Sequence, residues 1–322
     1  MAVVPGRAAP SPWRRVEVGG LALLGAVLCL AALLVLLTPR SFDLPSPTGR
    51  ILAAAALYAG SHALRLLRLA LLVHRPGLPT RRVALIHLYT SALGLLIPFK
   101  LNELIRIREL GVACGSWRTG LVAVWLERTL DAAVLAALLL LALLGDPGSA
   151  ADLAPVLLAV GGFVALTLIL AFVAPGNMRG LMLHLVRRPG GERSVQALRF
   201  LRGALTTLKD APALVRGRLP TLVLLSVGVW IAELMTLSIA VSGLDLTLSR
   251  LSAATLAVLS GVSFEAPALV SASADGFRDA LQRVGSAGAA PAYRAVLVLP
   301  LAVAGALAAV RYVPWRARGV AR

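Results

Sequence analysis

Two short segments bring charged side chains into an otherwise apolar sequence. Residues 97–110 read IPFKLNELIRIREL, and residues 125–134 read WLERTLDAAV. Both segments combine basic side chains with carboxylates. Arginine suits a phosphate, because its planar guanidinium group donates two parallel hydrogen bonds. Carboxylates can hold such arginines in place, so the pattern indicates a site for an anionic group.

The polar residues of the first segment are spaced to share one side of a helix. At about 100° per residue, the predicted helix 99–111 has a polar side and an apolar side. The polar side carries Asn102, Glu103, Arg106 and Glu109, and the apolar side carries Leu101, Leu104 and Ile105. Arg106 is an i,i+3 neighbour of both glutamates and can pair with either. We expect the apolar side to face packed helices and the polar side to face a water-filled cavity.

The second segment places Glu127, Arg128 and Asp131 well inside a predicted helix. Arg128 can pair with Asp131 at i,i+3, whereas the carboxylates of Glu127 and Asp131 share a face and repel each other. Arg106 or Lys100, in the neighbouring segment, is the cation nearest in sequence that could compensate them. Charge near the centre of a bilayer costs about 2.5–3.5 kcal/mol per residue, so a cluster in a spanning helix should not face lipid.

Two interpretations of these charges remain open, and they overlap. In the first, the charges form a buried salt-bridge network that fastens residues 97–110 to the next helix. In the second, some of them also bind an anionic headgroup in a polar cavity. The headgroup ligands would be Lys100, Asn102, Arg106 and Arg128. The supporting charge network would be Glu103, Glu127, Asp131, Glu233 and Glu265.

Two of these glutamates and two histidines lie apart from the charged segments in the sequence. Glu233 lies near the middle of an apolar block, and Glu265 lies at a break in the chain; either could carry a proton or pair with an arginine. His62 and His87 are isolated, and we expect them to be hydrogen-bonded core residues rather than ligands. We expect no catalytic residue set, no metal site and no cofactor, because no soluble catalytic motif and no metal-binding spacing is present.

The composition identifies the setting as a membrane. Of 322 residues, 58% are hydrophobic and only 15% are charged, whereas soluble proteins carry about 25% charged residues. The net charge of +17 would also fit nucleic-acid binding. The arginines gather at the ends of apolar blocks, however, as they do in membrane proteins whose cytoplasmic loops are positively charged. We therefore expect a protein of the cytoplasmic membrane with no nucleic-acid partner.

Six apolar blocks are long enough to span a membrane, since a spanning helix needs about 20 residues. They are residues 18–37, 50–73, 118–144, 152–174, 219–243 and 292–313. Basic residues set their orientation. Those near both termini place the N-terminus and the C-terminus in the cytoplasm. Arg65, Arg68, Arg75, Arg81 and Arg82 place the end of the second block there as well.

Two remaining apolar regions must return to the side from which they enter. Residues 83–117 begin and end on the cytoplasmic side, and residues 244–291 begin and end outside. We therefore predict two re-entrant helical hairpins. The first would break at Pro98, and the second at Gly261 and Pro267.

Each predicted hairpin lies between two full spans, which gives two units of opposite orientation, approximately 50–144 and 219–313. Such inverted repeats are common in transporters. The predicted fold class is an all-α polytopic membrane protein with about six transmembrane helices and two re-entrant hairpins. We expect a single membrane domain over residues 1–322.

A basic cytoplasmic loop, residues 175–218, would join the two units. It carries nine basic residues and two acidic ones. An apolar stripe at helical spacing predicts one interfacial helix in it: Val195, Leu198, Leu201, Leu205 and Leu208. This helix could pack on the protein's own cytoplasmic face or could contact anionic lipid.

The motif LGLLIPFKLNELIRIREL, followed by AVWLERTLDAAVL, resembles the signature of the lysylphosphatidylglycerol synthase transmembrane family. This family is also described as flippase-like and includes the membrane half of the multiple peptide resistance factor. The matching residues are Pro98, Glu103, Arg106, Glu127, Arg128 and Asp131. Lys100 stands where the family usually has arginine, and Asn102 replaces a glycine. In the second-half signature only Gly261 and Glu265 align.

The resemblance implies an inverted-repeat fold, often a homodimer, that moves or exposes lipids. We expect a flippase-like protein that binds and translocates an anionic phospholipid or polyprenyl-linked lipid. The alternatives are an intramembrane transferase acting on a lipid-phosphate donor, and a non-transporting scaffold for a separate lipid synthase or glycosyltransferase. The sequence ends at Arg322 without the soluble aminoacyl-transferase of fused members, so we expect it not to be a complete synthase.

Overall fold

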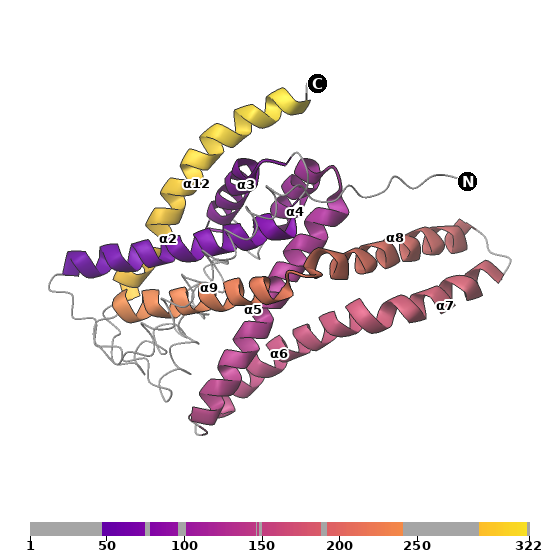
Figure 1. Cartoon of the computed structure of the whole chain (residues 1–322), viewed down its shortest axis with the longest axis horizontal. Helices are drawn as coiled ribbons and strands as arrows, with labels where there is room; N and C mark the ends of the chain where they lie inside the picture. Colours follow the sequence, from indigo (N-terminus) through magenta and orange to yellow (C-terminus); the bar gives the residue numbers. More distant parts are fainter. Residues whose placement is uncertain are drawn as a thin grey trace.

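A computed structural model describes residues 47–74, 78–95, 101–145, 147, 150–187, 192–240 and 290–320. Every regular element in these ranges is helical, which confirms the all-α class (Figure 1). The predicted span 18–37 and the second predicted hairpin, 244–291, lie outside the described residues apart from the first two residues of the last helix. The count of six spans and two hairpins therefore stays a prediction.

Among the residues that the structure describes, three helical stretches are long and apolar enough to cross a membrane. They are α5 (Trp117–Gly145), the stretch Leu153–Val173 and α9 (Leu219–Ala240). The predicted span 292–313 lies within α12 (Ala290–Val320), and the predicted span 50–73 lies within α2 (Pro47–Leu72) except for its last residue. These apolar helices mark the chain as a membrane protein.

The centre of the molecule is formed by α2 and α9, which lie side by side and run in opposite directions (Figure 1). α5 crosses both helices, and α12 packs along α2 and α3. In α9 nearly every residue from Leu225 to Leu237 is buried, so this helix is enclosed on all sides. The antiparallel pair places the first helix of each predicted unit at the core.

Residues 80–114 form two short helices, α3 (Thr80–Leu93) and α4 (Leu101–Cys114), which pack against each other. Each has 14 residues and is about 21 Å long, too short to cross a bilayer core of about 30 Å. α4 ends at Gly115, which has a φ of 64°. The amide of Ser116 donates to the carbonyl of Gly111 at 2.9 Å, the hydrogen bond of a glycine-terminated helix end.

Two glycines allow this helix pair to approach its neighbours closely. A Cβ atom on Gly120 of α5 would meet the carbonyl oxygen of Ile107 and, at 2.9 Å, the amide nitrogen of Gly111 in α4. A Cβ atom on Gly305 of α12 would meet the Cβ atom of Ala92 in α3. The pair α3–α4 is therefore held between α5 on one side and α12 on the other.

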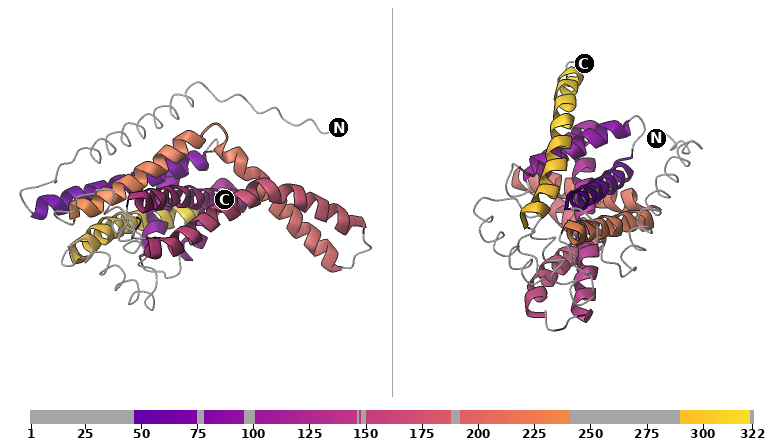
Figure 2. Two further views of the ribbon diagram at one scale, coloured as in Figure 1. Left: turned by 90° about the horizontal axis from the view of Figure 1, so that it is seen from below. Right: turned by 90° about the vertical axis from the view of Figure 1, so that its left-hand side faces the viewer.

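Residues 175–218 do not form a loop with a single helix. α6 (Ala150–Leu168) continues through a π-helical turn, η2 (Ile169–Val173), into α7 (Ala174–Arg187), and α8 (Glu192–Val215) returns beside it. The two helices form an arm that extends away from the other helices (Figures 1 and 2). The prediction of one interfacial helix is thus wrong in number, because the apolar span runs on without a break into the basic segment.

The stripe predicted for α8 is largely confirmed. Leu205 is buried, and Leu198, Leu201 and Leu208 are partly buried, whereas Val195 is exposed. The basic residues off the stripe, Arg199, Arg202 and Lys209, are exposed. The stripe packs toward protein, since α8 contacts both α7 and α5.

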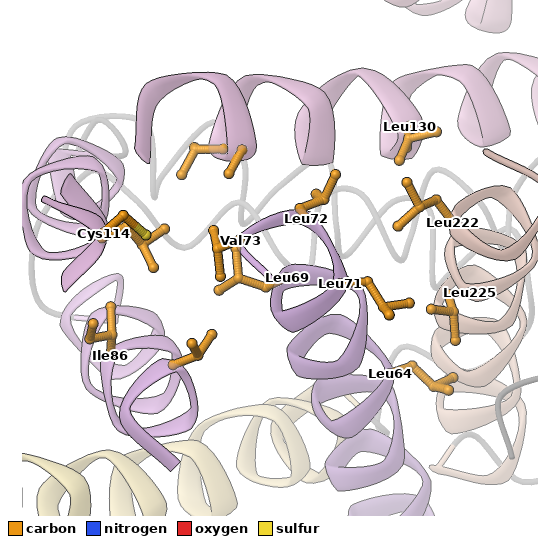
Figure 3. Packing of buried hydrophobic residues seen from close by; sticks show 14 of the residues in the cluster. Leu64, Leu69, Leu71, Leu72, Val73, Ile86, Cys114, Leu130, Leu222 and Leu225 are labelled. Atoms are coloured by element: carbon orange, nitrogen blue, oxygen red, sulfur yellow. The ribbon is translucent and has the colours of Figure 1, made fainter. Parts of the chain in front are cut away.

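Two apolar clusters lie toward opposite ends of α5 and α9. One includes Leu139 and Leu237, and the other includes Val124, Leu222 and Leu225. Figure 3 shows the second cluster, in which leucines of α2 meet those of α9 and Ile86 and Cys114 of the short helices. Along the chain, Glu127 and Arg128 of α5 lie among residues of the second cluster, and Glu233 of α9 lies among residues of the first.

Candidate functional site

Arg68 lies at the centre of the charged cluster. Its side chain is fully buried. Its Nη1 donates to Asp131 Oδ1 at 2.5 Å and to Ser226 Oγ at 2.7 Å, and its Nη2 donates to Glu127 Oε1 at 3.0 Å. One arginine of α2 therefore joins two carboxylates of α5 to α9. The repulsion expected between Glu127 and Asp131 is compensated mainly from α2.

Arg106 of α4 reaches the same glutamate from the other side. Its Nη2 lies 3.1 Å from Glu127 Oε2, so the pairing predicted from the sequence is present. The same nitrogen donates to Nδ1 of His87 in α3 at 2.8 Å. Arg106 thereby links three helices, and its side chain is almost completely enclosed.

Arg128 forms the accessible edge of the cluster. Its guanidinium group pairs with Glu103 of α4 and lies 3.7 Å from Asp131 within α5. The predicted i,i+3 pair with Asp131 is therefore present, while Glu103 pairs across helices rather than with Arg106. About a third of the Arg128 side chain, 35%, is exposed, whereas that of Arg68 is at 0%. Arg128 is thus the most exposed of the four arginines in these ion pairs.

Sequence analysis used Arg65 and Arg68 to place the end of a span in the cytoplasm and gave them no part in the charged cluster. In the structure Arg65 pairs with Glu233 of α9, and Arg68 occupies the centre of the cluster. The positive-inside rule reads position along the chain but not the direction of a side chain, so it did not reveal these contacts. The usable signal was spacing: His62, Arg65 and Arg68 recur at i,i+3 on one face, and α2 continues for a full turn to Leu72.

The two histidines expected to be isolated are neighbours. His62 Nδ1 of α2 lies 3.4 Å from His87 Nε2 of α3, and the ring of Tyr58 packs edge-on to that of His62 with centroids 4.8 Å apart. They are hydrogen-bonded core residues, as predicted. Through Arg106 they also join the charged cluster, which pattern reading along a single helix could not reveal.

Asn102 connects the two short helices. Its Nδ2 donates to the carbonyl of Thr90 in the last turn of α3 at 3.3 Å, while its Oδ1 is buried with no hydrogen-bond partner among the described residues. A Cβ atom on Gly94 would lie 2.7 Å from Asn102 Nδ2, so this contact requires glycine there. The two other candidates, Lys100 and Glu265, lie outside the described residues.

The side of α4 that faces protein is the polar one, the reverse of the prediction. Asn102, Arg106 and Glu109 are buried, while Leu101 and Leu104 are exposed, Leu104 by 62%. In a membrane protein the leucines can contact lipid, and the charges are satisfied by other helices. Beyond the cluster, Tyr312 of α12 donates to Glu109 Oε2 at 2.6 Å.

The ion pairs of the cluster balance. Across the described residues, four arginines pair with four carboxylates: Arg65, Arg68, Arg106 and Arg128 with Glu103, Glu127, Asp131 and Glu233. The Nε atoms of all four arginines are nevertheless buried with no hydrogen-bond partner in this part of the chain. Buried donors are normally satisfied, so the cluster as a whole has unused hydrogen-bonding capacity.

The ion pairs of the cluster lie inside the helix bundle, and two of the helices that form it, α5 and α9, are apolar enough to cross a membrane. The chain is therefore a membrane protein with charged residues in its interior. Residues 23–321 match the family described as the lysylphosphatidylglycerol synthase TM region. The match covers most of the chain, so the chain belongs to this family, a membrane domain related to lipid synthesis or flipping. The resemblance found from the motifs of residues 93–135 is confirmed. No protein of curated function and no solved structure matches the chain.

Proposed function

We propose that the chain binds an anionic phospholipid or a polyprenyl-linked lipid by its headgroup and moves it across the cytoplasmic membrane. The observation that carries this proposal is the buried cluster of arginines and carboxylates with Arg128 at its accessible edge. Membership of a lipid-related membrane family supports it.

The cluster lies at a depth suited to a carrier. Glu127 is about 15 Å along α5 from its first residue, and Glu233 is about 21 Å along α9, at 1.5 Å per residue. A bilayer core is about 30 Å thick. Both carboxylates would therefore lie near its middle, where transporters commonly bind their substrates.

The energetic cost of the cluster also supports a function. A buried ion pair often gives no more stability than apolar side chains of similar volume, and charges inside a membrane commonly mark a substrate path. The cluster of this chain recruits four arginines from three helices. A purely structural role could be filled by leucines, as it is in the adjoining cluster of Figure 3.

The arrangement of the helices fits the inverted repeat. α2 and α9 are antiparallel (Figure 1), as the first spans of two oppositely oriented units would be. α3 and α4 are each too short to cross the bilayer, which suits a re-entrant hairpin. The counterpart in residues 244–291 and the cytoplasmic location of both termini remain part of the proposal.

In this mechanism the headgroup phosphate first meets Arg128, the exposed arginine. It then reaches the Nε donor of Arg106, with Lys100 and Asn102 as further ligands. Glu103, Glu127 and Asp131 hold the guanidinium groups in position. Glu265 would belong to the second unit.

Reconstituted vesicles with fluorescent phosphatidylglycerol or polyprenyl phosphate test the proposal. Wild-type protein should move the label between leaflets, and Arg128→Gln should slow this at least tenfold. Arg108→Gln is the matched control, because Arg108 lies on α4 but is exposed. Chemical conversion of the lipid would instead favour the transferase, and neither movement nor conversion would favour the scaffold. Wild-type rates in folded Arg106→Ala and Glu127→Gln would refute the site.

A further inference from the structure

The charge balance of the cluster limits how it can accept an anion. Each arginine in the described ion pairs already has a carboxylate, four of each kind. An additional negative charge in this low-dielectric interior is costly unless a positive charge arrives with it. A group that can become cationic near neutral pH would meet this need, and histidine is the side chain suited to it.

The two histidines lie directly against the headgroup site. Arg106 has no acceptor atom, so the 2.8 Å contact from its Nη2 requires His87 Nδ1 to be the acceptor. In the neutral ring the proton then lies on His87 Nε2. That nitrogen faces His62 Nδ1 at 3.4 Å, so His62 accepts there and carries its own proton on Nε2. Arg106 thus sets the tautomers of both rings.

We propose that binding of the anionic headgroup is coupled to uptake of one proton by the His62–His87 pair. This inference rests on the proposed function. The proton comes from water and forms an N–H bond at His87 Nδ1, which ends the hydrogen bond from Arg106 Nη2. The freed guanidinium donor and the new Nδ1–H both turn to the headgroup oxygens. His62 keeps accepting from His87 Nε2. When the headgroup leaves, the proton returns to water.

The groups around the histidines explain why the lipid is needed. They are Tyr58, Arg65 and Arg68 of α2, Arg106 of α4 and Glu127 of α5. Arg65 is itself paired with Glu233 of α9. α12 contributes Tyr312, which is bonded to Glu109 of α4. The arginines oppose a further positive charge, and the nearby carboxylates are already engaged with them. A headgroup phosphate changes this balance by bringing a negative charge to Arg106, so the proton and the anion should bind together.

Calorimetric titration of full-length protein in lipid nanodiscs tests the coupling. The probes are short-chain phosphatidylglycerol and a short polyprenyl phosphate, each in two buffers of different ionisation enthalpy, with short-chain phosphatidylcholine for comparison. Wild-type protein should take up about one proton per bound anionic headgroup. Because binding takes up a proton, affinity should weaken about tenfold per pH unit as pH rises through neutrality.

His87→Gln should bind with proton uptake close to zero and with an affinity that does not depend on pH. His184→Gln is the matched control, since His184 is exposed on α7, and it should behave as wild type. His62→Leu should lower the proton count by removing the acceptor for His87. If His87→Gln does not fold, the number of protons that the wild-type protein takes up on binding still tests the coupling.

Binding of an anionic probe without proton uptake would overturn this inference and leave the proposed function intact, with a fixed cation such as Lys100 compensating the headgroup. Absence of binding by both anionic probes would overturn the proposed function and the coupling together.

Discussion

α9 and the α6–η2 stretch are both apolar enough to cross a membrane, yet they occupy opposite environments. In the α9 window 78% of residues are buried inside the protein, whereas in Leu153–Val173 only 6% are. The mean hydropathy of the second stretch is the higher of the two, 2.8 against 2.1. α9 carries buried Ser226, Glu233 and Thr236. Of these two stretches, the one with more buried polar residues is the more enclosed by protein, although its mean hydropathy is lower.

Polar residues mark the central helix because lipid cannot satisfy them. Glu233 requires Arg65, and Ser226 accepts from Arg68. The α6–η2 stretch has one buried polar residue, Thr167, and its many exposed apolar side chains can face acyl chains. The comparison predicts that substitutions at the α2–α9–α5 contact are costly, while those on α6 are not.

The largest expected effect is at Arg68. Arg68→Leu removes a fully buried cation and leaves Glu127 and Asp131 close together, which should cost about 3–5 kcal/mol of unfolding free energy. Thermal unfolding in detergent measures this. Arg50→Leu, at the start of the same helix, is the control and should change little. Equal melting temperatures for the two variants would contradict the central position of Arg68.

Leucine-to-alanine substitutions should have a smaller effect on stability, and this effect should differ between α9 and α6. Leu225 of α9 is completely buried, whereas Leu158 of α6 is 76% exposed. Leu225→Ala should cost about 2–5 kcal/mol through the lost contacts and the cavity, and Leu158→Ala less than about 0.5 kcal/mol. Chemical denaturation of the two variants side by side gives the comparison. A large loss at Leu158 would show that another surface covers α6.

The smallest expected effects are those of two Gly→Ala substitutions, and their effects on stability should have opposite signs. A Cβ atom on Gly162 of α6 meets nothing within 4 Å, so Gly162→Ala should stabilise the helix by about 0.5–1 kcal/mol. Gly120→Ala should destabilise, because its Cβ atom would press on the backbone of Gly111 and Ile107. Melting temperatures that move in the same direction would contradict the close contact between α4 and α5.

The sequence predicted the all-α class and part of the site. The two arms predicted for the first hairpin, 83–97 and 99–111, fall on the helices α3 and α4. The pairs Arg106–Glu127 and Arg128–Asp131 could be predicted, because a charge in an apolar block requires a partner and few partners lie nearby in sequence. Arg65, Arg68 and the contact between His62 and His87 were not predicted. These residues meet partners on helices more than twenty positions away, and residue spacing within one helix does not reveal which face meets which.

The predicted orientation of α4 was wrong for a related reason. An amphipathic helix in water hides its apolar side, and the prediction followed that rule. In a membrane the rule reverses, since lipid accepts Leu104 and the protein interior satisfies Arg106. The same reversal explains why α9, the most buried span, carries Glu233 in its middle.

The central claim is that the charged cluster binds a lipid headgroup at its Arg128 edge. Native mass spectrometry of protein extracted in mild detergent tests it most directly, by comparing lipid retained by wild type, Arg128→Gln and Arg108→Gln. The structure predicts an anionic lipid on wild type and on Arg108→Gln, and its loss from folded Arg128→Gln. Equal retention by all three proteins, or no anionic lipid on wild type, would contradict the claim.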